Sequence, residues 1–118
     1  MTRSIIDLSA AHLRRQFLNQ TQRGRFGTLE ALQELAISAR GCVSSSLSAS
    51  RVTVAFVLER VLDQCAADYQ RRVLRISEIA DLSSSLYDPV LRAIEFLAGA
   101  DDDPVDIAAS LIGTRPPQ

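Results

Sequence analysis

The middle of the chain repeats apolar side chains at helical spacing over a long stretch. Gly41 and Pro89 enclose a segment without any glycine or proline, the residues that most often interrupt helices. On a helical wheel, residues 51–82 form one apolar stripe opposite a charged face. The stripe consists of Leu58, Leu62, Cys65, Tyr69, Val73, Ile76 and Ala80. We therefore predict one long central helix over 51–82, with Ser50 as its N-cap.

Such a helix would be too long and too apolar for one small globule. It would span about 48 Å at ~1.5 Å per residue, whereas a compact chain of this length is about 35 Å across. Phe56 and Leu74 lie outside the main stripe, so packing within one chain would leave both side chains exposed to solvent. Arg72 lies at the edge of the stripe and is a candidate for an interface ion pair. We expect a homodimer whose interface includes Phe56, Arg72 and Leu74.

Two further helices are expected before the central one. The first covers residues 4–20, with Ser4 as N-cap and an inward stripe of Ile6, Ala10, Leu13 and Phe17. The segment 21–27 contains two glycines and no apolar period, which indicates a loop. The second helix runs from Thr28, a capping residue, to Arg40, just before Gly41. Its inward residues are Leu32, Leu35 and Ala39.

Two Asp-Pro pairs predict the starts of two short helices. Asp88-Pro89 and Asp103-Pro104 each offer a capping carboxylate followed by a proline, which suits the first helical position. The predicted helices cover 89–98 and 104–112, and residues 113–118 are expected to form a flexible tail. The fold class is therefore all-α: a single domain over 1–118, built as a bundle of about five helices around the long one.

Composition and charge narrow the functional classes. Hydrophobic residues make up 47% of the chain and charged residues 23%, as in ordinary globular proteins. The formal net charge of -1 opposes bulk attraction to nucleic acid or to an anionic membrane. The longest apolar run, 52–58, is too short to cross a bilayer, and no secretion signal is evident. Every basic residue is arginine, which favours a GC-rich, bacterial coding sequence, and two cysteines alone favour a reducing cytosol.

No residue pattern indicates catalysis, a cofactor or a metal ion. His12 is the only histidine and is expected at the surface, so a multi-histidine site is excluded within one chain. Cys65 is expected to be buried, whereas Cys42, at a helix end, is expected to be exposed as a candidate redox thiol. The acidic residues around Asp103 lack the glycine of a calcium loop. The arginines at 71, 72 and 75 fit a solvated helix face with nearby carboxylates.

One basic region could contact an anion. Residues 1–27 carry a net charge of +4, and the remainder of the chain carries -5. The candidate anion contacts are Arg14, Arg15, Arg23 and Arg25. We expect a small non-enzymatic regulator, adaptor or chaperone that docks a helical surface on itself and on another protein. The alternative is a nucleic-acid-binding regulator that uses the arginine-rich first helix and loop.

Overall fold

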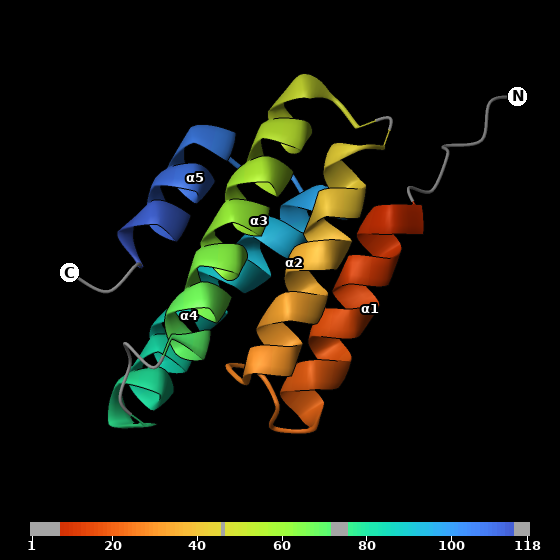
Figure 1. Ribbon diagram of the computed structural model, residues 1–118. Coiled ribbons are helices and arrows are strands. Elements are labelled where there is room, and N and C mark those ends of the chain that lie inside the picture. The colour runs from red at the N-terminus through yellow and green to blue at the C-terminus, as the bar shows by residue number, and fades with distance from the viewer. Residues whose placement is uncertain (1–7, 46, 72–75, 115–118) are drawn as a thin grey trace, which may run out of the picture.

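The computed structural model describes residues 8–45, 47–71 and 76–114, with side chains described from residue 83 onward in the last range. This part of the chain forms five α-helices and no strand, so the all-α prediction is confirmed (Figure 1). The helices are α1 (Leu8–Gln22), α2 (Leu29–Val43), α3 (Ala49–Gln70), α4 (Ile76–Leu97) and α5 (Pro104–Gly113).

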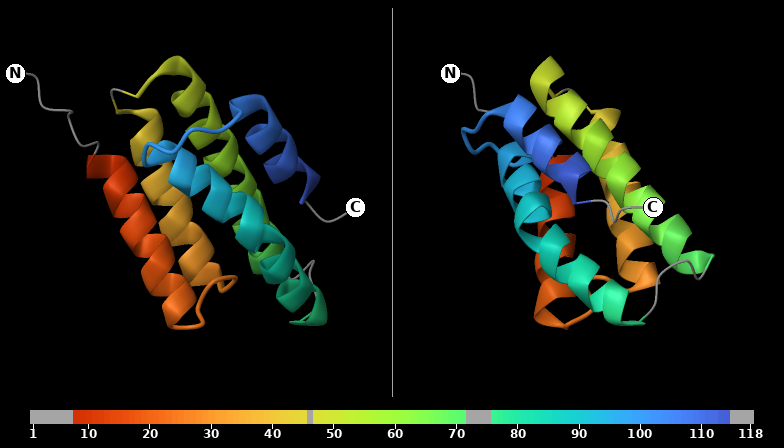
Figure 2. Two further views of the ribbon diagram at one scale, coloured as in Figure 1. Left: turned by 180° about the vertical axis from the view of Figure 1, so that it is seen from behind. Right: turned by 90° about the vertical axis from the view of Figure 1, so that its left-hand side faces the viewer.

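The first four helices form an up-and-down bundle. Consecutive helices run in opposite directions, and contacts follow the order α1, α2, α3, α4 and back to α1 (Figures 1 and 2). Helix α5 packs against both α3 and α4. Helix α3 therefore contacts three other helices, and one side of it remains outside the bundle.

The single helix predicted over 51–82 is wrong. Helix α3 ends at Gln70 with Arg71 as its C-cap, and the Arg71 amide donates to the Ala67 carbonyl at 3.0 Å. Helix α4 begins at Ile76 and runs back along the bundle (Figure 2). Two antiparallel helices can bury their apolar faces within one chain, whereas a continuous rod could not. Two of the predicted interface residues, Arg72 and Leu74, lie outside the described residues.

The helix start predicted at Pro89 is also wrong, because Pro89 lies inside α4. An interior proline costs a helix about 3 kcal/mol. Each large apolar side chain that becomes buried returns about 1.5–3 kcal/mol, and α4 buries such side chains on both sides of the proline. These are Leu86, Val90, Ile94 and Leu97. Tertiary packing thus outweighs the local signal of the Asp-Pro pair.

The other helix ends match the predictions in part. The Ala31 amide donates to Thr28 Oγ1 at 3.2 Å, and the Val105 amide donates to Asp103 Oδ1 at 3.1 Å, which confirms both predicted caps. The N-cap of α3 is Ser48 instead of Ser50. Helix α2 continues through Gly41 to Val43, and the thiol of Cys42 is fully buried against the core. The expected exposure of Cys42 is therefore wrong, because α2 extends past Arg40 and places Cys42 on its buried side.

Arginine side chains hold the outer helices in place. Arg14 Nε donates to Glu95 Oε1 at 2.6 Å and joins α1 to α4. Arg51 Nε donates to the Phe96 carbonyl at 3.0 Å and joins the start of α3 to the end of α4. Arg92 binds Asp102 through two nitrogens, at 2.6 and 2.7 Å, and also binds a carboxylate of α5. This bidentate contact lowers the pKa of Asp102 to about 2.

The loop between α1 and α2 contains a glycine that the packing requires. Gly27 is buried, has a φ of +97°, and lies where a Cβ atom would come within 2.9 Å of Ser83 Cβ on α4. Gly24, in the same loop, has a φ of +65°, and nothing lies within 4 Å of an added Cβ. The two glycines thus share a backbone requirement, and only Gly27 is held by close packing.

We predict that Gly27→Ala lowers the free energy of unfolding by about 2 kcal/mol or more, because strain and a steric clash add together. Gly24→Ala is the matched control and is expected to cost only about 1 kcal/mol of backbone strain. Urea denaturation followed by circular dichroism measures both values. Equal losses in the two variants would contradict the close contact between the loop and α4.

Candidate interaction face on helix α3

Residues on the outer face of α3 recur at alternating spacings of three and four. These residues point away from the bundle, while several residues between them, such as Leu58 and Leu62, are fully buried. We call this set the α3 seam: Thr53, Phe56, Arg60, Asp63, Ala67 and Gln70. Ala67 is half-buried and the other five are exposed. This alternation of three and four is the spacing that helices use to contact one another in coiled coils.

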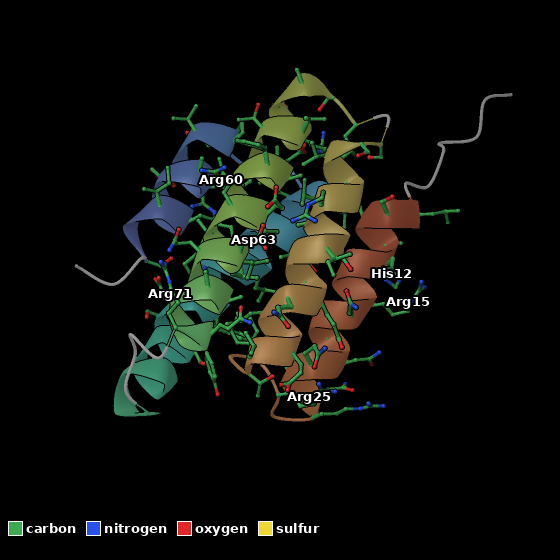
Figure 3. All side chains as sticks on the ribbon, viewed as in Figure 1. His12, Arg15, Arg25, Arg60, Asp63 and Arg71 are labelled. Carbon is green, nitrogen blue, oxygen red and sulfur yellow. The ribbon has the colours of Figure 1, made fainter. Side chains whose placement is uncertain are left out.

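An open groove extends over this face. The α3 residues of the seam from Phe56 to Gln70 form most of it, together with neighbouring residues of the same helix. Helix α2 contributes Gln33 and Arg40, and α5 contributes Ile112. Figure 3 shows Arg60 and Asp63 on the outer side of α3. The groove is therefore a surface made by three helices and centred on one of them.

Two large apolar side chains in the groove remain in contact with solvent. Phe56 is 49% exposed and Ile112 is 57% exposed. On α5, Val105 and Ala109 share the outer side of the helix with Ile112 and are also exposed. Scattered apolar residues are common on protein surfaces, but a group around a groove is typical of interaction sites. The predicted interface residue Phe56 thus lies where a partner could reach it.

A charged cluster lies beside these apolar residues, between α2 and α3. Arg40 Nη2 lies 3.0 Å from Asp63 Oδ2 and 3.5 Å from Glu59 Oε2. Glu59 is buried, whereas Asp63 and Arg40 are exposed. The hydrogen bond to Asp63 and the burial of Glu59 raise the pKa of the Glu59 carboxyl, and the nearby Arg40 only partly opposes this rise. Two carboxyl groups here share a single guanidinium.

Arg60 is the cation that does not join this cluster. Its guanidinium lies 5.9 Å from the centre of the Phe56 ring, one turn earlier on α3. It forms no ion pair with any residue that the structure describes, although Asp63 is three residues away on the same helix. The unpaired Arg60 cation thus lies next to an exposed aromatic ring and close to two carboxylates that share one guanidinium.

The four arginines predicted as anion contacts differ in exposure and in pairing. Arg14 is engaged by Glu95, and Arg25 is half-buried in the loop after α1. Arg15 and Arg23 are exposed. Figure 3 places Arg15 on the outer side of α1 and Arg25 at the end of the bundle, and α2 separates both from α3. Only part of the predicted patch is available to a ligand.

The remaining candidate residues show no assembled site. His12 is exposed on α1, as expected (Figure 3). Cys65 is buried in the core, as expected. Among the described residues, no group of three histidine, cysteine, aspartate or glutamate side chains could hold a metal ion. No described helix is both long enough and apolar enough to cross a membrane.

The sequence predicts Phe56 as an interface residue but does not single out the residues around it. Arg60, Asp63 and Glu59 belong to the charged face opposite the apolar stripe, and Arg40 lies near the predicted end of the second helix. The spacing of three and four residues along the seam was visible in the sequence. The prediction of one helix over 51–82 accounted for the apolar stripe, so this second spacing was not used.

No protein-family model, curated protein sequence or solved structure matches this chain.

We predict that Glu59→Gln changes how stability depends on pH. A carboxyl whose pKa is raised in the folded state binds more protons when folded, so wild-type stability should fall as pH rises from about 4.5 through the raised pKa. The Glu59→Gln variant lacks this decline. Its stability relative to wild type should therefore increase between pH 4.5 and pH 7. Thermal denaturation across this range measures the difference.

Asp63→Asn provides the matched control, because Asp63 is the main cause of the raised pKa. This variant keeps Glu59 and should lose most of the pH-dependent decline. A decline that persists unchanged in Asp63→Asn would contradict the coupling between the two carboxyl groups.

Proposed function

We propose that this protein is a small non-enzymatic regulator or adaptor that acts by protein-protein contact through the outer face of α3, and that it associates with itself. The exposed pair Phe56 and Ile112 in the groove carries this proposal, because docking a partner there would remove apolar surface from water. Arg40, Arg60 and Asp63 around them would supply orientation and specificity. The two buried thiols suit the reducing cytosol expected from the sequence.

The groove offers contact area more readily than chemistry. Its ionisable residues are arginines and carboxylates on an open surface, and its other members are apolar or amide side chains. Enzyme active sites usually enclose their reacting groups and exclude water from them. An interaction module needs neither property. The nucleic-acid alternative has weaker support, because Arg14 is paired with Glu95 and Arg25 is half-buried, which leaves two of the four arginines exposed and without an ion pair among the described residues.

We expect sedimentation velocity to show a dimer at micromolar concentration that dissociates on dilution. Phe56→Ser should weaken the association about tenfold or more, because aromatic residues at the centre of an interface contribute most of its energy. Leu8→Ser is the matched control, because Leu8 is 77% exposed at the start of α1 and does not line the groove. Its association should match that of wild type.

A wild-type monomer throughout the micromolar range would contradict the self-association. Equal weakening in both variants would contradict the groove as the place of contact.

A further inference from the structure

The α3 seam is complementary to itself when read in the opposite direction. Its midpoint lies between Arg60 and Asp63, so a second copy of α3 placed antiparallel across this point sets Arg60 opposite Asp63 of the other copy. The same placement sets Phe56 opposite Ala67, and Thr53 opposite Gln70. Each of these contacts occurs twice, as a two-fold interface requires.

The charges favour the antiparallel arrangement over the parallel one. A parallel pair would set Arg60 against Arg60 and Asp63 against Asp63, and like charges repel. The antiparallel pair instead gives Arg60 an acidic partner, which it lacks among the described residues of its own chain. It also brings a second cation to Glu59 and Asp63, which share only Arg40 among the described residues of one chain.

The side-chain sizes agree with the charges. Phe56 projects a large ring from the seam, and Ala67 lies at the opposite position of the second copy. Small residues leave a hole in a helix surface that a large side chain can fill, which is the basis of knobs-into-holes packing. Arg40 holds Asp63 from the side of α2 at 3.0 Å, so the carboxylate is already in position.

We propose that two copies of this chain pair through antiparallel α3 helices, with reciprocal ion pairs between Arg60 and Asp63 and with each Phe56 ring seated on Ala67 of the other copy. This inference rests on the proposed self-association and names its geometry. Gln33 and Arg40 of α2 and Ile112 of α5 border the same groove and enlarge the contact on both sides of the helix pair.

A charge exchange tests the arrangement. Arg60→Glu alone sets two acidic pairs in its homodimer, and Asp63→Arg alone sets two basic pairs. Each variant should therefore associate at least about tenfold more weakly than wild type. A one-to-one mixture restores two opposite-charge pairs and should form a heterodimer within about threefold of wild-type affinity. Sedimentation of each variant alone and of the mixture measures these values.

The double variant R60E/D63R controls for damage to the fold. It reverses both members of each pair on one chain, so its homodimer regains opposite charges and should recover wild-type association. If the Asp63→Arg substitution misfolds the chain, association will be recovered neither in the mixture nor in the double variant. Circular dichroism of each variant shows whether the helices are retained.

Crosslinking tests the direction of the helices independently. The natural thiols Cys42 and Cys65 are buried, so a thiol introduced at Phe56→Cys or Ala67→Cys reports on the seam. A short thiol crosslinker should join the two variants only when they are mixed. Two Phe56→Cys chains would hold their thiols about 16 Å apart along the axis in the antiparallel pair, so neither variant should crosslink to itself.

The outcomes separate the two proposals. A wild-type dimer in which the charge exchange fails in both the mixture and the double variant, with helices intact, overturns the antiparallel pairing and leaves self-association standing. Crosslinking of each cysteine variant to itself has the same meaning, because it indicates parallel helices. A wild-type monomer overturns self-association and the pairing together.

Discussion

Burial of the inner side of α3 is the constraint on which the rest of the structure depends. Leu58, Leu62 and Cys65 lie at the centre of the core, and α2, α4 and α5 each pack against this helix. Side chains of this size contribute roughly 1.5–3 kcal/mol each when fully buried, which is large relative to the total stability of a small domain. Helix α1 completes the bundle from the opposite side, through contacts with α2 and α4. One helix thus organises the fold and also presents its remaining side to solvent.

Guanidinium groups are used in two different ways around this core. Arg14, Arg51 and Arg92 each reach from one helix to acceptors on another part of the chain, and their several nitrogen donors allow one side chain to bind more than one oxygen. Arg60 differs from these three because its neighbours in the described structure are an aromatic ring and solvent. Arg60 is therefore an arginine of the groove that has no carboxylate partner among the described residues. A cation without a partner beside exposed apolar side chains is more useful to a partner than to the monomer.

The inner faces of the helices were predictable from the sequence, because a buried stripe must follow the helical period. Leu13, Phe17 and Leu35 were assigned to the core in this way and are fully buried. The end of α3 was not predictable, because the apolar period continues past Arg71 and no glycine or proline marks the turn. The helix start predicted at Pro89 was wrong for the opposite reason. There a strong local signal was outweighed by the burial of Leu86 and Val90 on the two sides of the proline. Local preference and tertiary burial thus disagree at both errors, and burial decides the outcome.

The break after α3 also changes the meaning of the exposed residues. On a continuous helix, Phe56 would belong to a thin second line of apolar residues along a rod, and a partner would have to cover that whole length. In the folded chain the exposed part of α3 ends at Gln70, so a partner needs to cover only about five turns of helix. Within that length Phe56 lies near one end, Ala67 lies near the other, and the opposite charges of Arg60 and Asp63 lie between them. A large residue, a small residue and a balanced charged centre on one short helix face favour a partner of the same length and the opposite direction, and α3 itself meets both conditions.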